Sequence, residues 1–294
     1  MGAMDLPLPE PALRFGAFAL IFGALVVLEL AHPRLERDEM RGALRSRRWL
    51  TNLSMVVISS VALRLVFPLA AVGTALWAQA EGIGLFNVID VSGWIAGIAV
   101  FVALDFAVWL EHVASHRIPL LWRIHRMHHA DTGFDVTTAL RFHPLEIVLS
   151  MVWKALVIVA LGAPVLAVLV FEIVLNGMAM FNHSNVRLPL GLDRWLRRVV
   201  VTPDMHRVHH SSLRRETDSN YGFNLAVWDR LFGVYVAQPG LGHEGMEIGL
   251  EAWRDPREAA GLRWTLLLPF RPVRVPAAGN AAGEATRGEA PFGG

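Results

Sequence analysis

Nine of the twelve histidines in this 294-residue chain fall into short groups that suit metal binding. Residues three and four apart on a helix lie on one face, with Cβ atoms roughly 5–6 Å apart, so HxxxH and HxxHH spacings aim imidazoles at one point. Imidazole is a ligand for zinc, copper, iron and nickel. The nine residues form an HxxxH pair, two HxxHH triplets and one separate histidine: His112 and His116; His125, His128 and His129; His206, His209 and His210; and His183.

The number of grouped histidines favours two metal ions. One zinc ion takes three or four protein ligands, so nine imidazoles exceed the capacity of a single ion. The three rings of an HxxHH triplet can converge on one ion or divide between two, and the spacing leaves both arrangements open. Outside these groups, we consider His143 a possible ligand or outer partner of a ligand, exclude His32 from the site, and expect His243 at the surface.

The composition indicates a membrane protein. Hydrophobic residues make up 54% of the chain and charged residues only 18%, and the mean hydropathy is +0.42. The net charge of +1 gives no indication of nucleic-acid binding. The chain contains no cysteine, which excludes disulfides, thiolate ligands and a cysteine nucleophile. A transition metal must therefore be held mainly by nitrogen and oxygen ligands.

Four apolar stretches predict an all-α membrane bundle of three spans plus a helical hairpin. About 20 apolar residues in a helix cross the roughly 30 Å hydrocarbon core. The sequence Gly-Ala-Pro at 162–164 interrupts the last stretch, which predicts the turn of the hairpin. The first stretch has no basic segment before it and no cleavage site, so we expect a membrane anchor there. The stretches are residues 12–30, 53–77, 91–110 and 147–180.

The more polar segments predict a helical cap on the cytoplasmic side of the membrane. Arginine is concentrated at one end of the predicted spans, and positive charge is enriched in cytoplasmic loops. This rule places all the histidine groups in the cytoplasm and the N-terminus on the far side. The predicted divisions are an N-terminal tail (1–11), one membrane-embedded domain (12–275) with a cap formed by 112–145 and 183–275, and a disordered Ala/Gly/Pro-rich tail (276–294).

Charged residues inside the apolar stretches predict two ion pairs, because such charges are costly in a bilayer and are usually paired. Lys154 and Glu172 each lie nine residues from Ala163, so a hairpin that turns there places them at equal depth. Arg64 and Asp105 also fall at similar depth. A water-lined substrate cavity is the alternative location for these groups.

The ordered histidine series resembles the fatty acid hydroxylase superfamily, also described as sterol desaturase-like, whose members are integral-membrane, histidine-rich di-iron enzymes. The resemblance covers about residues 95–240. One position departs from some members, which carry another histidine four residues before His183, where this chain has Ala179. Besides the nine histidines, the resembling residues are Asp105, Trp109, the stretch His143-Pro144-Leu145-Glu146, Asn182, Ser184, Asn220-Tyr221-Gly222 and 228–233.

The resemblance implies two iron ions held by the nine grouped histidines, with zinc as a possible substitute in purified protein. It also implies O₂ as co-substrate and a membrane lipid, sterol or isoprenoid-type substrate, in which an unactivated C–H bond is oxidised. Hydroxylation is favoured over desaturation. Ligating histidines usually donate their second N–H to a nearby acceptor. The candidates for that role, or for ligation, are His143, Asp131, Asp204, Asp218, Asn220 and Asp229.

Electrons are expected to come from a separate electron-transfer protein, because the predicted spans and cap leave no segment for a fused carrier. The alternative functions are a membrane metal transporter and a non-redox metal-binding membrane protein. A transporter needs ligands near the middle of the bilayer, whereas the histidine groups lie at the predicted ends of the spans. The sequence gives no indication of the oligomeric state.

Overall fold

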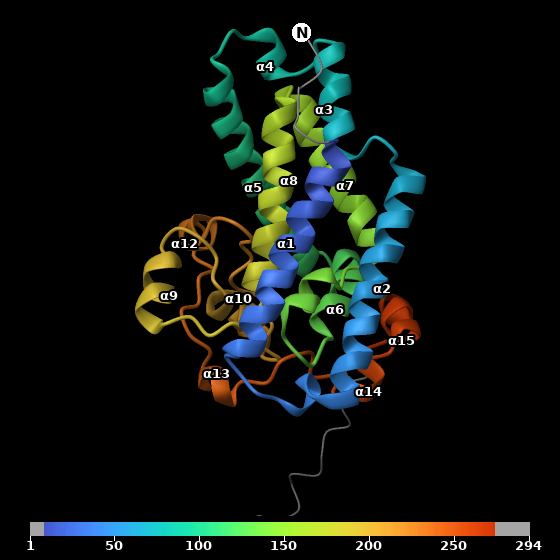
Figure 1. Cartoon of the computed structure of the whole chain (residues 1–294), viewed down its shortest axis with the longest axis vertical. Helices are drawn as coiled ribbons and strands as arrows, with labels where there is room; N and C mark the ends of the chain where they lie inside the picture. The colour runs from blue at the N-terminus through green and yellow to red at the C-terminus, as the bar shows by residue number, and fades with distance from the viewer. Residues whose placement is uncertain (1–8, 274–294) are drawn as a thin grey trace, which may run out of the picture.

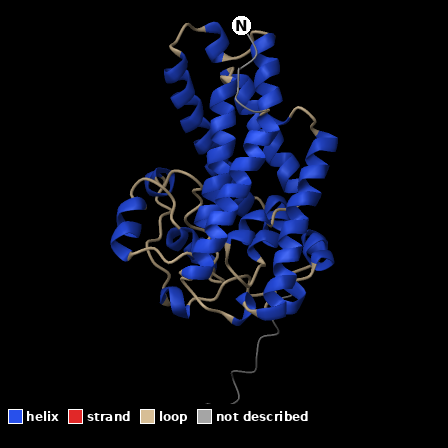
Figure 2. Cartoon of the chain, viewed as in Figure 1, coloured by secondary structure: helices blue, strands red, loops and turns tan. Residues whose placement is uncertain are grey.

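The structure, a computed structural model, describes residues 9–273, and this part of the chain is helical (Figure 2). Between residues 9 and 273 no strand forms, and extended pairing is limited to four isolated bridges. The prediction of an all-α protein is confirmed. The predicted tail at 276–294 and residues 1–8 of the predicted N-terminal tail lie outside the described residues, and the first helix begins at Glu10.

In the described residues, six helices form the membrane part; most of the other helices surround their lower ends, and α4 lies at the upper end (Figure 1). The helices of the membrane part are α1 (Glu10–Ala31), α2 (Gly42–Val66), α3 (Ala70–Ala80), α5 (Gly93–Arg117), α7 (Pro144–Leu161) and α8 (Val165–Asn182). The others are η1 (Asp38–Met40), α4 (Leu85–Val88), α6 (Pro119–His129), η2 (Val136–Leu140), α9 (Leu190–Leu196), α10 (Pro203–His209), α11 (Arg214–Thr217), α12 (Val227–Leu231), α13 (Gly242–Gly245), α14 (Pro256–Ala259), α15 (Leu262–Leu267) and η3 (Leu268–Phe270).

Within residues 9–273, five helical segments are long and apolar enough to cross a membrane. Their large apolar side chains are widely exposed: Leu20 is 74%, Leu65 79% and Trp94 70% exposed. Exposed apolar surface of this extent is stable in lipid rather than in water, and a helix satisfies its own backbone groups there. The chain is an integral membrane protein. The segments are Glu10–Ala31, Gly42–Val88, Gly93–Arg117, Pro144–Leu161 and Val165–Asn182.

The stretch predicted as a single span at 53–77 consists of two helices, α2 and α3, separated by a break at Pro68. Proline lacks an N–H donor and disfavours helical conformation in the residue before it, and Phe67 has left the helix with φ −135° and ψ 74°. The chain then turns so that α3 packs on α7 and α8. Alanines of α3, including Ala71 and Ala75, contribute to the buried core shared with those helices.

The predicted hairpin is present as α7 and α8, which have 18 residues each. Gly162 follows α7 with φ 60°, a left-handed conformation that favours glycine. A Cβ atom at this position would lie 2.9 Å from the carbonyl oxygen of Ile83 and 2.7 Å from Nδ2 of Asn87. Pro164 then precedes the first residue of α8. The turn at 162–164 therefore depends on both backbone conformation and close packing.

The predicted ion pair inside the hairpin is confirmed. Nζ of Lys154 lies 2.6 Å from Oε1 of Glu172. A third residue joins the pair, because Nη2 of Arg14 in α1 lies 2.9 Å from Oε2 of Glu172. Arg14 also contacts Glu10 at 3.0 Å. The buried carboxylate of Glu172 therefore connects three helices of the membrane part.

The second predicted ion pair, between Arg64 and Asp105, is wrong. Arg64 is exposed and donates to the carbonyl oxygen of Pro68 in its own chain segment. Asp105 is buried and accepts hydrogen bonds from Nε1 of Trp228 at 2.7 Å and from the backbone N–H of Leu225 at 3.3 Å. Similar depth in the membrane does not bring two side chains together when their helices turn them in different directions.

A buried network of charges joins the base of α2 to the segment after α6. The guanidinium of Arg48 donates to Asp131 at 2.7 Å and to Asp135 at 2.9 Å. All three side chains are buried. Arg141 extends the network to the C-terminal helices by donating to the carbonyl oxygen of Ala259 at 2.8 Å. These contacts fix the loop that follows the first histidine triplet.

Candidate metal centre

The nine grouped histidines come together in two buried clusters within the described part of the chain. In each cluster one ring nitrogen per histidine lies within 4.8 Å of those of the others. The rings come from α5, α6, the C-terminal end of α8 and the α10 region. The five-histidine cluster consists of His112, His116, His125, His129 and His209, and the four-histidine cluster consists of His128, His183, His206 and His210.

Each HxxHH triplet divides between the two clusters. In α6, the i,i+4 pair His125 and His129 joins the five-histidine cluster, and His128 joins the other. In the second triplet, the i,i+4 pair His206 and His210 joins the four-histidine cluster, and His209 joins the five-histidine cluster. Rings from the two triplets are in contact, with centroids 4.6–4.7 Å apart. Both clusters therefore depend on the packing of α6 against α10.

The four-histidine cluster is centred on His183. Its Nε2 atom lies 3.1 Å from Nε2 of His128, 3.1 Å from Nε2 of His206 and 3.2 Å from Nε2 of His210. All four residues are buried, with exposed fractions of 0%. The four Nε2 atoms thus gather at one enclosed point.

His125 has the corresponding central position in the five-histidine cluster. Its Nε2 atom lies 3.2 Å from Nε2 of His112 and 3.2 Å from Nε2 of His129. The Nε2 atoms of His116 and His209 are buried and have no hydrogen-bond partner. Unpartnered buried nitrogen is destabilising unless a ligand or water satisfies it, so this cluster also has the donor set of a metal site.

Acceptors outside the clusters define the protonation of six rings. A carbonyl oxygen accepts hydrogen bonds only, so a neutral ring whose Nδ1 contacts a carbonyl carries its hydrogen on Nδ1 and a lone pair on Nε2. The contacts of the Nδ1 atoms are His112 to Tyr221 O at 2.7 Å, His128 to Arg141 O at 3.3 Å, His183 to Ala179 O at 2.7 Å, His209 to Ser219 O at 2.6 Å, His125 to Glu146 Oε1 at 2.6 Å and His116 to Asp218 Oδ1 at 3.3 Å.

These tautomers leave lone pairs facing each other. His128 and His183 each direct Nδ1–H to a carbonyl, so no hydrogen remains for the 3.1 Å contact between their Nε2 atoms. Two nitrogens 3.1 Å apart, each ~2.1 Å from one ion, subtend an angle of about 95° at that ion. This angle lies between those of octahedral and tetrahedral coordination. The residues present therefore fit a cation at each cluster.

The pKa values of the rings agree with neutral ligands. Burial lowers the pKa of His183 to about 4 and that of His209 to about 3. Burial also holds the pKa values of His206 and His210 well below the ordinary range, and neighbouring imidazoles lower them further. A metal ligand must be the neutral imidazole, and these rings are neutral at physiological pH.

Three of the candidate outer residues support the clusters. Asp218 accepts from His116 directly. Asp229 acts through the backbone, because its carboxylate accepts the N–H groups of Tyr221 at 2.8 Å and of the following residue at 3.0 Å. Asn220 holds the same loop by donating to the carbonyl oxygens of Met205 and Val236. This loop supplies the carbonyl oxygens of Tyr221 and Ser219 that accept from His112 and His209.

The other candidates are directed elsewhere. Asp131 accepts from Arg48, and Asp204 is paired with Arg207 and with Arg34. Both carboxylates are paired with arginines, so the expected contact with a clustered histidine is not formed. His143 lies outside both clusters and caps α7, where its Nδ1 accepts from the N–H of Leu145 at 3.2 Å.

His243 is a further correction, because it is buried rather than on the surface. Its Nε2 lies 3.6 Å from Oδ2 of Asp204, and the residue belongs to neither cluster. The short helix α13 places it against α10. The burial of His243 could not be predicted from the sequence, because a single histidine in a loop forms no periodic pattern.

Glu146 was not predicted as a site residue. It lies in the first turn of α7, where an acidic side chain is commonly explained by the helix dipole. Its Oε1 accepts from Nδ1 of His125 at 2.6 Å, and its Oε2 is buried without a partner. A carboxylate in this position orients the ring and increases its basicity.

Replacing Glu146 with glutamine is expected to weaken metal binding at the five-histidine cluster by about 10–100-fold, the usual effect of losing such a partner. Titration of the metal-free protein with iron or zinc measures this change. Glu111→Gln is the matched control, because Glu111 lines the same cavity but accepts from Ser150 rather than from a histidine. Equal affinities of the Glu146 variant and the wild type would contradict the assigned role.

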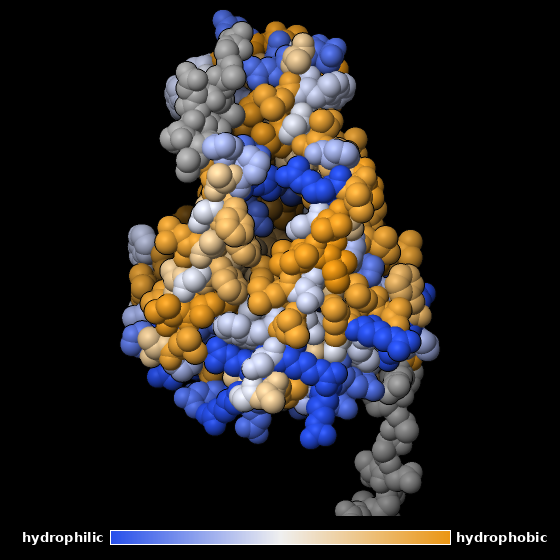
Figure 3. All heavy atoms as spheres, turned by 45° about the vertical axis from the view of Figure 1, so that its right-hand side comes forward, coloured by the Kyte–Doolittle hydropathy of each residue, from blue (hydrophilic) through white to orange (hydrophobic). Residues whose placement is uncertain are grey.

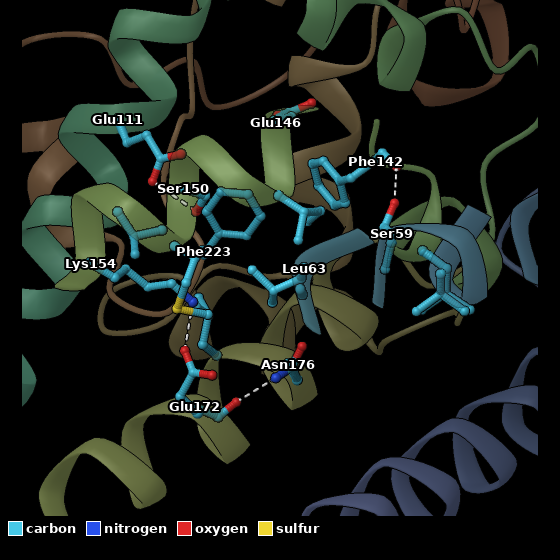
Figure 4. Close-up of a pocket in the computed structure, with 18 of the residues that line it drawn as sticks. Ser59, Leu63, Glu111, Phe142, Glu146, Ser150, Lys154, Glu172, Asn176 and Phe223 are labelled. Carbon is cyan, nitrogen blue, oxygen red and sulfur yellow. Dashed lines mark hydrogen bonds and ion pairs between the residues drawn. The ribbon is translucent and has the colours of Figure 1, made fainter. Parts of the chain in front are cut away.

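A cavity of about 260 Å³ extends from the five-histidine cluster into the membrane part (Figure 4). His112 and His125 line one end. Lys154 and Glu172 lie across the cavity from Glu146 in the close-up view. The wall between is mainly apolar, and residues of α1, α2, α5, α7 and α8 contribute to it. A long apolar molecule therefore has access to the cluster from within the membrane part.

The cavity adjoins a groove on the lipid-facing surface between α1, α2 and α8. The groove has a volume of about 450 Å³ and shares five lining residues with the cavity: Arg14, Phe18, Val56, Ser60 and Asn176. Figure 3 shows a hollow on this largely apolar face of the molecule. The arrangement provides a lateral opening toward the bilayer.

Comparison with known proteins places this site in a family. Residues 97–234 match the model of the fatty acid hydroxylase family. An ornithine lipid hydroxylase from Rhizobium tropici is 32% identical over 139 residues, which are 47% of this chain and 41% of that protein. The human alkylglycerol monooxygenase is 31% identical over 159 residues, 54% of this chain and 34% of that protein. A fatty acid hydroxylase from Lecanicillium is 29% identical over 159 residues, 48% and 43% of the two chains.

The chain spans less than half the length of these relatives. No solved structure matches it significantly. The family match begins within α5 and ends just after α12, so it includes every segment that supplies a ring to the two clusters. Residues 97–234, which carry all nine clustered histidines, therefore match the fatty acid hydroxylase family.

Proposed function

We propose that this protein is an O₂-dependent, di-iron membrane oxidoreductase that hydroxylates a C–H bond of a lipid. The observation that carries the proposal is the set of Nε2 lone pairs that face each other in two buried clusters, one of which borders an apolar cavity. Such nitrogen sets suit a cation, and imidazole ligands suit iron. The names of the relatives, all hydroxylases or monooxygenases of lipids, support the reaction class.

Each cluster would hold one iron ion, and bound iron would supply the reduction of O₂ that no side chain provides. In the overall reaction, a C–H bond becomes C–OH with one oxygen atom of O₂. The other oxygen atom leaves as water with two electrons and two protons from an external donor. Desaturation would remove two hydrogens without inserting oxygen into the lipid. The relatives are named a hydroxylase and a monooxygenase, which insert an oxygen atom, so their names favour hydroxylation here.

The protein's own residues would position the lipid and exclude water. The groove between α1, α2 and α8 lets an apolar chain enter from the bilayer. Apolar side chains such as Leu63, Met151 and Phe223 line its path toward His112 and His125. Since only the five-histidine cluster contributes residues to the cavity wall, oxidation would take place beside that cluster.

Electrons would come from a separate protein that binds the cap. Exposed arginines on the cap, including Arg194, Arg198 and Arg215, offer positive charge to an acidic partner. The placement of the cap in the cytoplasm, and of the N-terminus on the far side, stays a prediction from the distribution of arginine.

Iron reconstitution tests the proposal. Protein purified in detergent and loaded with iron is expected to hold about two ions per chain, one for each nitrogen set. With a chemical reductant and membrane lipid extract, it should consume O₂ and produce a lipid heavier by one oxygen atom. The variants His128→Ala and His209→Ala, which each remove a ring from one cluster, should lose the product.

Two outcomes would favour the alternative functions. Metal bound to both clusters without any reductant-dependent O₂ consumption would indicate a non-redox metal protein. Metal uptake into sealed vesicles that hold the protein would indicate a transporter, although ligands at the ends of the spans disfavour it. Zinc in the protein as first purified does not decide between these functions, since iron reconstitution replaces it before the assay.

A further inference from the structure

We propose that Lys154, together with Asn176 and the carboxylate of Glu172, forms a polar anchor for the substrate in the cavity, and that this anchor binds an uncharged, oxygen-bearing group of an amphiphilic lipid. This inference rests on the proposed function, since it names the substrate class of the same cavity. It assigns the buried charges a role in binding in addition to connecting the helices.

The charged residues face the cavity although charges in the membrane are expensive. Glu172 is 3% exposed and Lys154 is 9% exposed, and both line the cavity together with Arg14. In Figure 4, Lys154 extends across the cavity to Glu172, and Asn176 lies next to Glu172 on α8. A purely structural contact between α7 and α8 is made as well or better by apolar side chains, because burying an ion pair carries a large desolvation penalty.

The positive charges at the anchor are all paired. Lys154 is paired with Glu172, and Arg14 bridges Glu172 and Glu10. Glu111, which accepts from Ser150, is a further carboxylate on the cavity wall. With no positive charge left unpaired, the site does not favour an anionic group, and the ammonium of Lys154 disfavours a cationic one. It favours a neutral polar group.

Hydrogen-bonding capacity remains for such a group. An ammonium has three donors, and among residues 9–273 the one side-chain hydrogen bond of Lys154 is with Glu172 at 2.6 Å. The amide nitrogen of Asn176 donates to the backbone carbonyl of Glu172 at 2.7 Å, which leaves its amide oxygen as an acceptor. The donor of Lys154 and the acceptor of Asn176 together suit a hydroxyl group, which both donates and accepts. The donor of Lys154 alone suits a carbonyl oxygen.

Helix geometry gives the reach of the substrate. Lys154 lies eight residues after Glu146, the partner of His125, on α7, which corresponds to about 12 Å along the helix axis. The substrate would therefore carry a polar group separated by about 12 Å of apolar chain from the carbon that is oxidised.

Binding of a matched pair of probes tests the anchor without any turnover. Dodecanol and dodecane share a linear apolar chain and differ only by the hydroxyl group. Their affinities for the purified, full-length protein can be measured by the rise in thermal stability with ligand concentration. We expect the wild type to bind dodecanol about tenfold more tightly than dodecane, the range that one or two hydrogen bonds supply.

The double variant Lys154→Met/Glu172→Leu should lose this preference and keep its affinity for dodecane. It replaces the ion pair by apolar side chains, so no buried charge of the pair is left without its partner. Thr74→Val is the control, because Thr74 is a buried polar residue of the membrane part whose hydroxyl donates to the carbonyl oxygen of Ala70 in its own helix. An unchanged preference for dodecanol in the double variant would overturn the proposal and leave the pair as a structural contact.

The test separates this inference from the proposed function. If the protein binds dodecanol through the anchor but never consumes O₂, the polar anchor stands and the oxidoreductase proposal fails. If the protein oxidises lipids and the double variant binds both probes as the wild type does, the anchor fails and the oxidoreductase proposal stands.

Discussion

Replacing His183 with alanine is expected to remove one metal ion per chain and to abolish lipid oxidation. Its Nε2 atom is within 3.1–3.2 Å of the Nε2 atoms of all three other rings in the four-histidine cluster. Loss of this central ligand should weaken binding at that cluster by more than the 10–100-fold that removal of an outer partner causes. Elemental analysis of the purified variant measures the metal content, and product formation measures the activity.

The corresponding variant His125→Ala should empty the other cluster. The remaining ion should then be the one that His183→Ala loses, so the double variant is expected to be free of metal. His143→Ala is the control, since this buried histidine belongs to neither cluster and should retain the full metal content. His143 caps α7, so the His143→Ala variant should have a free energy of unfolding lower by about 1 kcal/mol. Full metal content in His183→Ala would contradict the assignment of the cluster.

Replacing Arg48 with methionine is expected to produce the largest loss of stability. The guanidinium is fully buried between Asp131 and Asp135. Without it, two buried carboxylates lose their partner, and breaking a buried pair in this way costs about 3–5 kcal/mol. In a chain of about this size, each kcal/mol of lost stability lowers the melting temperature by about 2–4 °C, so the melting temperature should fall by about 6–20 °C. Thermal unfolding in detergent measures the change.

Arg64→Met is the matched control for Arg48→Met. Both arginines belong to α2, but Arg64 is exposed and contacts the carbonyl oxygen of Pro68 alone among the hydrogen bonds described. Its replacement should change the melting temperature by no more than about 2 °C, since surface substitutions usually change stability by less than about 0.5 kcal/mol. Similar melting temperatures for the two variants would show that the network around Arg48 contributes little.

The sequence predicts the membrane part well because the bilayer leaves few choices. A long apolar segment must be helical, since lipid offers no hydrogen-bond partner to the backbone. The hairpin follows for the same reason, once Gly162 and Pro164 interrupt the last segment. Lys154 and Glu172 could be paired from the sequence because they are equally distant from the turn and lie on adjacent helices that the turn joins.

The failed pair shows the limit of this reasoning. Arg64 and Asp105 lie on helices that are not joined by a short turn, so equal depth fixes one coordinate and leaves the rotation of each helix undetermined. Rotation about the axis directs Arg64 outward and Asp105 toward Trp228. Asp131 and Asp204 do not contact the clustered histidines for a similar reason, since proximity in sequence does not fix the direction of a side chain.

The sequence by itself determined that nine histidines are available as ligands and that helical spacing aims their rings in groups. Only the tertiary structure decided how these rings divide between two clusters, because the division depends on the packing of α6 against α10 and on the position of His183. The tautomers were likewise decided by the fold. Backbone carbonyls carry no sequence signal, yet those of Tyr221 and Ser219 determine which nitrogens of His112 and His209 face the cluster.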